Sequence, residues 1–325
     1  MSKILVTGGA GFVGSHLVDS LVREGHQVTV LDVTPAEDAH HLESVRSKIH
    51  YLQGDIRSSD DVRAAFDGVP DTVYHLASVV GVQRYVSDPL AVVDVIVGGT
   101  RNVLESVTRS GSRLVVTSTS EIFGRNPEIP WAEDSDRVLG SPSVDRWSYA
   151  SAKGVAEHMI FAMARRGMDA SIVRFFNAYG PRQNPEFVVS QSVRQVLRGE
   201  RPLIYDGGRQ TRCFTFIDDI IEGTIAVGST PEATGQAFNL GNPVETEIRQ
   251  VVNRIIELAD VSITPENFST EEHFGDRYED VSRRVPGVEK ARELLGWTAN
   301  TSLDDGLRAT LDWAHANPWW WRGES

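Results

Sequence analysis

The sequence predicts an α/β fold in which a doubly wound parallel sheet is joined to a smaller C-terminal α/β lobe. Short apolar stretches alternate with helical stretches through residues 1–175, as strands linked by helices do. The strands are apolar on both faces, as expected for a parallel sheet that helices cover on each side. The pattern changes after Asn177, where Pro181, Pro185, Pro202 and the pair Gly207 and Gly208 interrupt the chain.

The individual elements follow from these apolar patterns. The expected strands are Lys3–Thr7, Gln27–Leu31, Ile49–Gln53, Thr72–His75, Arg113–Thr117 and Ala170–Arg174. The helices expected between them are Phe12–Glu24, Ser59–Phe66, Leu90–Ser110 and Tyr149–Arg166. The helices expected in the second part are Val188–Arg198, Asp218–Gly228, Glu247–Leu258, Val288–Leu295 and Leu303–His315. The chain therefore divides into residues 1–176 and 177–325, with a discontinuous border because some later segments return to the first domain.

Charge and composition exclude several kinds of partner. The 325 residues are 40% apolar and 24% charged, which is ordinary globular composition. The formal net charge of −13 repels phosphate backbones and anionic lipid, so we expect neither nucleic acid nor a membrane as partner. The single Cys213 cannot form an intrachain disulfide, and no signal peptide or apolar run of about 18 residues is evident. We expect a cytoplasmic protein without a metal site, in which Trp319–Trp321 pack against the body or a neighbouring subunit.

A glycine pattern at the first strand–helix turn predicts a dinucleotide site. The run Thr7-Gly-Gly-Ala-Gly-Phe-Val-Gly14 follows the first strand and opens the first helix. Gly8 allows a tight turn, Gly11 lets the backbone approach a pyrophosphate, and Gly14 lets the helix lie close to the strand. The helix N-terminus offers N–H groups and a partial positive charge to phosphates. The pattern indicates a Rossmann-type doubly wound parallel sheet.

Asp32, at the end of the second strand, indicates which dinucleotide is bound. Its carboxylate can accept hydrogen bonds from both ribose hydroxyls, whereas it would repel a 2′-phosphate. Val33 and Thr34 supply no compensating cation, so we expect NAD rather than NADP. Asp55, after the third strand, fits two roles equally well. It could hydrogen-bond the adenine amino group, or it could cap the helix that follows.

Tyr149 and Lys153 form the predicted catalytic pair. Their spacing of four residues at the start of a helix puts both side chains on one face. A free tyrosine has a pKa of about 10 and is a poor base at neutral pH, so we expect the ammonium of Lys153 to favour the phenolate. The same lysine can hold the nicotinamide ribose. Thr119, just past a strand, can hydrogen-bond the substrate hydroxyl.

Five motifs together carry a resemblance to a known family. They are the glycine run, His75-Leu-Ala-Ser78, Ser118-Thr-Ser-Glu-Ile-Phe-Gly124, Tyr149-x-x-x-Lys153 and Arg174-Phe-Phe-Asn-Ala-Tyr-Gly-Pro-Arg182. Over nearly its whole length the chain resembles the extended short-chain dehydrogenase/reductases that modify nucleotide sugars. The resemblance implies tightly bound, recycled NAD, a nucleoside diphosphate sugar between the lobes, and a homodimer. It also implies a substrate contact from Asn177 and cofactor contacts from Gly8, Gly11, Phe12, Val13, Gly14, Asp32, Asp55, Ile56, Leu76, Ala77, Tyr149 and Lys153.

Glu121, Arg212 and the run Arg283-Arg284 narrow the chemistry. With Arg146-Trp-Ser-Tyr149 and Tyr85, they make the sequence similar to the UDP-glucuronate decarboxylases, including the UDP-xylose synthases. In those enzymes a C4 ketone lies β to the C5 carboxylate, so carbon dioxide can leave as electrons flow into an enolate. The product is UDP-xylose, or the UDP-4-keto-pentose if release is early. The resemblance implies the catalytic residues Thr119, Glu121, Tyr149, Lys153 and Arg212, and the substrate contacts Tyr85, Ser120, Asn177, Arg212, Arg283 and Arg284.

Other reactions of the same family stay open. The stretch Ala77–Arg84 lacks the prolines of eukaryotic UDP-xylose synthases, and the long insert Pro127–Arg146 is not diagnostic. The dipeptide Ser120-Glu121 also occurs in GDP-mannose 4,6-dehydratases, in which the glutamate removes the C5 hydrogen and water leaves from C6. A 4-epimerase is a further alternative. A non-catalytic NAD sensor is disfavoured because Tyr149 and Lys153 are intact.

Overall fold

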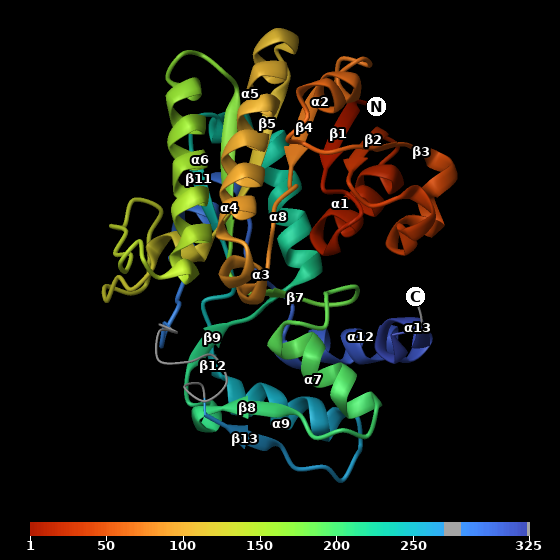
Figure 1. The fold of residues 1–325 in the computed structure, drawn as a ribbon, viewed down its shortest axis with the longest axis vertical. Helices are drawn as coiled ribbons and strands as arrows, with labels where there is room; N and C mark the ends of the chain where they lie inside the picture. The colour runs from red at the N-terminus through yellow and green to blue at the C-terminus, as the bar shows by residue number, and fades with distance from the viewer. Residues whose placement is uncertain (270–280, 324–325) are drawn as a thin grey trace.

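The computed structural model describes residues 1–269 and 281–323. Its centre is a seven-stranded sheet with the order β11-β6-β5-β4-β1-β2-β3 (Figure 1). All neighbouring strands pair in parallel, so their carboxyl ends meet at one edge. Because the order reverses at β1, the ends of β1 and β4 form the switch point at which such sheets bind ligands. The strands are β1 (Lys3–Thr7), β2 (Gln27–Asp32), β3 (Ile49–Gln53), β4 (Thr72–His75), β5 (Arg113–Thr119), β6 (Ala170–Phe175) and β11 (Ala237–Leu240).

Helices cover both faces of this sheet. Along β1, Ile4 and Val6 belong to one apolar core, whereas Leu5 between them belongs to another. The first core includes residues of α1 (Phe12–Arg23) and α8 (Ile217–Ser229). The second includes residues of α2 (Ser59–Ala65), α5 (Gly99–Ser110) and α6 (Ser148–Ala164). The predicted doubly wound α/β sheet is confirmed.

The helix expected at Leu90–Ser110 contains a π-helical turn. α4 (Pro89–Val93) leads into the π turn η3 (Asp94–Gly98), which continues as α5. The start of α5 lies very close to the segment after β3, because a Cβ at Gly99 would stand 2.3 Å from Cδ1 of Ile56. A π turn changes the face that the following helix presents to its neighbours. Hydrophobic periodicity alone did not reveal this turn.

β11 brings the later part of the chain back into the sheet. It pairs with β6, so that Ala237 lies opposite Ile172. α11 (Glu289–Leu295) packs beside it, and the Nζ atom of Lys290 lies 5.1 Å from the centre of the Phe238 ring. The sequence patterns did not identify β11 as a strand. A single division of the chain at residue 177 therefore separates this strand from the sheet to which it belongs.

The remaining elements form a smaller α/β lobe beyond the carboxyl ends of the sheet strands (Figure 1). Its strands pair two by two, β7 with β10 and β8 with β13 in parallel, and β9 with β12 antiparallel. The strands are β7 (Ala178–Tyr179), β8 (Leu203–Tyr205), β9 (Thr211–Cys213), β10 (Thr215–Phe216), β12 (Glu245–Glu247) and β13 (Glu266–Phe268). The helices of the lobe are α7 (Val188–Leu197), α9 (Ile248–Leu258), α12 (Leu303–Ala316) and α13 (Pro318–Arg322). A further short helix, α3 (Val82–Ser87), lies between β4 and α4 in the chain.

Short 3₁₀ helices connect several of these elements. They are η1 (Ala36–Asp38), η2 (His40–Lys48), η4 (Ser120–Phe123), η5 (Asp145–Trp147), η6 (Asp206–Gly208) and η7 (Pro231–Ala233). η4 directly follows β5 and η5 directly precedes α6, so both border the predicted catalytic residues. Within residues 1–269 and 281–323, no helix has the length and apolar character to cross a membrane.

The C-terminal tryptophans pack against the body of the same chain. Trp320 is 7% exposed, and its indole N–H donates to the carbonyl of Gln183 at 3.1 Å. The ring of Trp319 lies 5.5 Å from the ring of His40 and 5.6 Å from that of His41, measured between centroids. These contacts join the end of the chain to the segment between β2 and β3.

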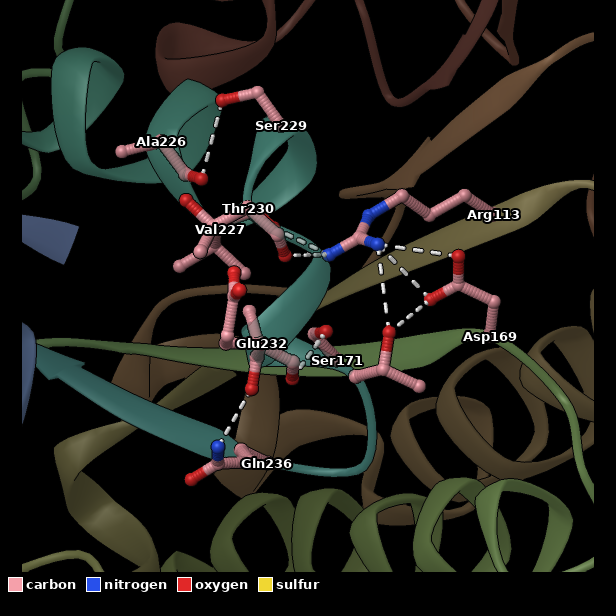
Figure 2. Close-up of polar contacts among 11 residues, drawn as sticks. Arg113, Asp169, Ser171, Ala226, Val227, Ser229, Thr230, Glu232 and Gln236 are labelled. Carbon is pink, nitrogen blue, oxygen red and sulfur yellow. Dashed lines mark hydrogen bonds and ion pairs between the residues drawn. The ribbon is translucent and has the colours of Figure 1, made fainter. Parts of the chain in front are cut away.

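Arg113, at the start of β5, ties α8 to the edge of the sheet where the strands begin (Figure 2). Its Nη2 atom donates to the carbonyls of Val227 at 2.8 Å and Thr230 at 2.6 Å, at the C-terminus of α8. Its Nη1 atom lies 3.1 Å from both carboxylate oxygens of Asp169. A cation at a helix C-terminus satisfies the last carbonyls and the helix dipole. This cluster stabilises the sheet at the end opposite the predicted site.

Candidate active site

The glycine turn between β1 and α1 is shaped to admit an anion. Gly8 has φ +73°, and a Cβ there would lie 2.7 Å from the backbone nitrogen of Ala77. A Cβ at Gly14 would lie 2.0 Å from the carbonyl oxygen of Gly8, so only glycine lets α1 approach the turn this closely. Gly11 is exposed, and no side chain of the described residues caps the first turn of α1. The N–H groups of Phe12 and Val13 at this turn suit a dinucleotide diphosphate.

Asp32 closes the same turn from the end of β2. Its Oδ2 atom accepts a hydrogen bond from the backbone N–H of Ala10 at 2.9 Å, and Oδ1 accepts from that of Thr34 at 3.0 Å. The carboxylate is therefore fixed beside the glycine turn, where an adenosine ribose would lie. On the other side of β1, the backbone of Leu76 donates to the carbonyl of Thr7 at 3.0 Å. These residues fit NAD, as the sequence predicts.

Asp55 is bound to its own loop. Its carboxylate accepts from the backbone N–H of Arg57 at 2.8 Å and pairs with the Arg57 guanidinium at 2.6 Å. The cap of α2 is Ser58, whose side chain accepts from the backbone N–H of Asp61. The helix-cap alternative for Asp55 is therefore wrong. Its contact with adenine stays a prediction.

Tyr149 and Lys153 lie on the first turns of α6 against the end of β5. Both are buried, at 5% and 6% exposure. The Nζ atom of Lys153 donates to the carbonyl of Thr117 at 2.9 Å. The Tyr149 hydroxyl lies close enough to the side chains of Thr119, Tyr85 and Ser78 for each of them to lower its pKa. The structure thus brings the tyrosine and the predicted threonine together.

Burial is the largest influence on the pKa values of this pair. Burial raises the pKa of Tyr149 above its ordinary value, and the charge of Glu121 adds to this effect. The side chains of Thr119, Tyr85 and Ser78 oppose the increase without outweighing it. Burial lowers the pKa of Lys153 to about 8, although the nearby carboxylate of Glu157 acts in the other direction. The lowering of the Tyr149 pKa that we expect from Lys153 stays a prediction, because burial is the largest effect on Tyr149 here.

Glu121 lies in η4 and is surrounded by arginines. Its Oε2 atom accepts from Nη1 of Arg146 at 2.9 Å, and its Oε1 atom lies 3.6 Å from Nη1 of Arg284. Burial would raise the pKa of Glu121, but the charges of Arg146, Arg284 and Arg212 outweigh burial and hold the pKa below its ordinary value. Glu121 is therefore a carboxylate, and it lies close enough to Tyr149 to influence the pKa of that residue.

The predicted arginines occupy different environments. Arg212, in β9, is buried and donates from Nη1 to the carbonyl of Thr211 at 2.8 Å. Arg284 is also buried and faces Glu121, whereas the neighbouring Arg283 is half exposed and forms an ion pair with Glu245 of β12. A substrate contact from Arg283 would require that ion pair to open.

Tyr85 lies against the ring of Tyr149 and does not present its own ring to open space. The two rings are stacked with centroids 4.4 Å apart and planes within 4° of each other. Tyr85 is 2% exposed, and its hydroxyl oxygen accepts from the backbone N–H of Gly81 at 2.9 Å. In this structure the Tyr85 ring packs on the ring of Tyr149, the predicted base, and the contact of Tyr85 with substrate stays a prediction.

Ser120 and Asn177 border the same region. Ser120 is buried at 2% exposure between Thr119 and Glu121. Asn177 follows β6 and has φ +39°, a conformation that asparagine tolerates better than most residues. Its amide nitrogen donates to the carbonyl of Cys213 at 3.2 Å, which joins the end of the sheet to β9. Their contacts with substrate stay predictions.

Arg146 is a buried residue of the candidate site that the sequence patterns did not single out by itself. It is 2% exposed and lies closer to the Glu121 carboxylate than Arg284 does, although Arg146 and Glu121 belong to different elements. The available signal was its place three residues before Tyr149.

Among the described residues there is no group of three or more His, Cys, Asp or Glu side chains suited to holding a metal ion.

A glycine turn at the switch point of a parallel sheet, together with a Tyr-x-x-x-Lys helix that meets the end of β5, defines an extended short-chain dehydrogenase/reductase. Residues 5–310 match the family model described as GDP-mannose 4,6 dehydratase, and the chain belongs to this family of NAD-dependent epimerases and dehydratases.

Comparisons with known proteins give several similar enzymes. A UDP-N-acetyl-alpha-D-glucosaminuronate decarboxylase from Bacillus cytotoxicus is 33% identical over 314 residues, which cover 96% of this chain and 97% of that protein. UDP-glucuronic acid decarboxylase 1 from Xenopus tropicalis is 35% identical over 318 residues, which cover 95% of this chain and 71% of that protein. The crystal structure of a UDP-glucuronic acid 4-epimerase from Bacillus cereus, in complex with UDP-glucuronic acid and NAD, has a TM-score of 0.86 at 28% identity, covering 97% of this chain and 99% of that one.

Proposed function

We propose that this enzyme decarboxylates UDP-glucuronate through a 4-keto intermediate, forming UDP-xylose or the UDP-4-keto-pentose. The observation that carries the proposal is the charge arrangement in which Arg146, Arg284 and Arg212 act on the single carboxylate of Glu121. Arginine forks bind carboxylate oxygens in pairs, so the guanidinium groups of Arg212 and Arg284 near Glu121 suit the carboxylate of a uronic acid. The two decarboxylases among the similar proteins, each acting on a UDP-uronic acid, support the same choice.

NAD is the cofactor, and the residues present fit it. The glycine turn would hold the diphosphate, Asp32 the adenosine ribose, and Lys153 the nicotinamide ribose. When bound, NAD supplies reversible hydride transfer, accepting hydride from C4 of the sugar and returning it later. The dinucleotide would be recycled within one turnover when UDP-xylose is the product, whereas release of the UDP-4-keto-pentose would leave it reduced and would consume one NAD per turnover.

Tyr149 and Thr119 would move the proton at C4. Tyr149 accepts the proton of the C4 hydroxyl as hydride leaves, and Thr119, which lies near enough to influence the pKa of Tyr149, aligns that hydroxyl. When the ketone is reduced, the same proton returns from Tyr149 to the C4 oxygen. Lys153, one turn along α6, supplies positive charge that offsets the phenolate during the time that the ketone exists.

The decarboxylation step needs a place for electrons and then for a proton. The C5–C6 bond breaks, carbon dioxide leaves, and the electron pair moves through C5 onto the C4 oxygen as an enolate. Arg212 and Arg284 would bind the sugar carboxylate and then stabilise the enolate charge. Glu121, held as a carboxylate, would orient these guanidinium groups and pass a solvent proton to C5.

A 4,6-dehydratase is the second candidate, and the low pKa of Glu121 favours it. An ionised glutamate can remove the C5 hydrogen of a 4-keto hexose, after which water leaves from C6. The arginines weigh against this reaction because a neutral hexose has no carboxylate to bind.

A 4-epimerase is supported by the likeness to the Bacillus cereus enzyme. A non-catalytic NAD sensor would not need Tyr149 and Thr119 in contact. A homodimer and a cytoplasmic location remain part of the proposal.

The test is product analysis by mass spectrometry. Purified protein is incubated with NAD and, separately, with UDP-glucuronate, UDP-N-acetylglucosaminuronate, UDP-glucose, GDP-mannose and dTDP-glucose. We expect loss of carbon dioxide from UDP-glucuronate and no reaction with the neutral hexoses. Loss of water from a hexose would replace the proposal with a dehydratase. A product of unchanged mass but altered chromatography would indicate an epimerase, and tight NAD binding without any turnover would indicate a sensor.

A further inference from the structure

Arg137 lies in the long segment between β5 and α6, and its guanidinium group joins the two elements that carry the catalytic residues. Its Nε atom donates to the carbonyl of Ile122 in η4 at 3.1 Å. Its Nη2 atom donates to the carbonyl of Ala150 in α6 at 3.2 Å. A guanidinium is planar and rigid, so two such bonds set the separation of their acceptors, which a lysine ammonium cannot do in the same way.

Gly154 makes this contact possible. A Cβ at this position of α6 would lie 2.1 Å from Nη2 of Arg137 and 2.2 Å from its Cζ. Any side chain at this position would displace the guanidinium group. A glycine inside a helix is unfavourable by about 1 kcal/mol relative to alanine, so its presence here needs a local reason. Close packing of Arg137 on the helix provides that reason.

The backbone next to Arg137 is also attached to η4. The N–H of Val138 donates to the carbonyl of Phe123 at 3.2 Å, and the N–H of Arg125 donates to the carbonyl of Val138 at 2.7 Å. A Cβ at Gly124 would lie 2.3 Å from that same Val138 carbonyl oxygen, so the two segments touch through their backbones. The base of the Arg137 side chain is thus held in place before its guanidinium reaches α6.

The residues that Arg137 contacts share one feature, since each directly follows a residue of the proposed catalytic set. Ile122 follows Glu121, Ala150 follows Tyr149, and Gly154 follows Lys153. We propose that Arg137 is a positioning residue, which locks η4 against α6 at the separation that the reaction requires. The inference rests on the proposed active site. It holds whether the reaction is decarboxylation, dehydration or epimerisation.

The first test replaces Arg137 with alanine in the NAD-loaded enzyme acting on UDP-glucuronate. We expect kcat to fall by about 10- to 100-fold, because small displacements of reacting groups have effects of this size, while KM changes little. Methylguanidine should restore part of kcat in Arg137→Ala and leave the wild type unaffected, since the Arg137 side chain is partly exposed. Arg165→Ala, which removes an exposed arginine after the end of α6, is the matched control and should keep wild-type kcat.

The second test uses the dependence on Gly154. Gly154→Ala should lower kcat by displacing the guanidinium, but it should add little to Arg137→Ala, because the side chain that it displaces is then already gone. Independent effects of the two substitutions would contradict the inference. The inference would also be contradicted if Arg137→Ala lost activity only in proportion to its loss of NAD-loaded protein, and if methylguanidine did not restore that activity.

Hydrogen exchange separates this inference from the choice of reaction. In the NAD-loaded enzyme without any sugar, Arg137→Ala should speed amide exchange in residues 119–124 and 148–154, and methylguanidine should reverse the change. Unchanged exchange in both segments would overturn the inference. By contrast, a wild-type enzyme that converts no nucleotide sugar would contradict the proposed function and leave the exchange result to decide the role of Arg137.

Discussion

Arg146 donates to Glu121 across 2.9 Å, and this ion pair joins η5 to η4 beside the predicted base Tyr149. The Arg146 side chain is 3% exposed and that of Glu121 is 16% exposed, so the interaction is shielded from solvent. Removing this cation would take away the largest of the charges that oppose burial, so the pKa of Glu121 would rise although Arg284 and Arg212 remain. The state of Glu121 therefore depends on a residue that belongs to another element.

Arg146→Met is expected to shift the acid limb of the pH profile of kcat/KM to higher pH. In the wild type the neighbouring arginines hold the pKa of Glu121 below its ordinary value, which favours the ionised carboxylate. Without Arg146 its pKa rises, and the carboxylate takes up a proton at a higher pH. Arg125→Met is the control, because Arg125 also lies over the Trp147 ring but is exposed. An acid limb at the same pH in both variants would contradict the role of the ion pair.

Tyr149→Phe is expected to lower kcat by about 10²- to 10⁴-fold, which is the usual contribution of a positioned acid–base group. NAD binding should persist, because the glycine turn and Asp32 are untouched. Tyr85→Phe keeps the stacked ring but removes a hydroxyl that lowers the pKa of Tyr149, so the limb on which activity rises as this base loses its proton should move to higher pH. Steady-state kinetics and NAD retention measure both effects. Full activity in Tyr149→Phe would refute the assignment of the base.

Glu157→Gln is expected to move the basic limb to lower pH. The Glu157 carboxylate raises the pKa of Lys153, which burial lowers to about 8, so without it Lys153 loses its charge at a lower pH. The same substitution leaves the buried Arg174 without its carboxylate partner and should cost about 3–5 kcal/mol of unfolding free energy. Glu157→Gln combined with Arg174→Met should recover stability in urea unfolding but not the pH shift. If the double variant restores both, Glu157 acts only through packing.

Asp32→Asn is expected to reduce the preference for NAD over NADP. The amide keeps an oxygen acceptor but loses the charge that binds the ribose hydroxyls, so NAD affinity should fall by about 10-fold or more, given about 1.5–3 kcal/mol for hydrogen bonds to charged groups. Repulsion of the 2′-phosphate also disappears, so NADP should bind better than it does to the wild type. Calorimetric titration with both dinucleotides measures this, with the exposed Asp38→Asn as control. An unchanged ratio of the two affinities would show that Asp32 does not select the cofactor.

Arg113→Met is expected to lower the free energy of unfolding by about 1.5–3 kcal/mol without changing kcat per folded molecule. The substitution removes the charged donors to Val227 and Thr230 and the pair with Asp169, all at the end of the sheet opposite the site (Figure 2). Arg109→Met removes only an exposed pair with Glu105 and should change stability by at most about 1 kcal/mol. If Arg113→Met and Arg109→Met lost equal free energies of unfolding, the contacts of Arg113 with the carbonyls of Val227 and Thr230 would contribute nothing to stability.

The predicted strand and helix bounds agree closely with the structure where the signal is local. The glycine run, the end of β2 at Asp32 and the start of α6 beside Tyr149 each depend on a few adjacent residues with a known period or turn requirement. β5 extends to Thr119, two residues beyond the predicted end, because Ser118 and Thr119 pair with the end of β6. That extension depends on a neighbouring strand, so local apolar character could not predict it.

By itself, the sequence determined the parallel sheet, the dinucleotide turn, the preference for NAD and the tyrosine–lysine helix, because each is encoded by residues close together in the chain. Only the tertiary structure decided that Tyr85 stacks on Tyr149, that Arg146 neutralises Glu121, and that β11 completes the sheet. It also decided the direction of the Tyr149 pKa, since burial and the charge of Glu121 arise only when distant segments pack together. Hydrophobic periodicity in the sequence specifies which face of a helix or strand is apolar. Tertiary packing specifies which polar groups from different elements come into contact.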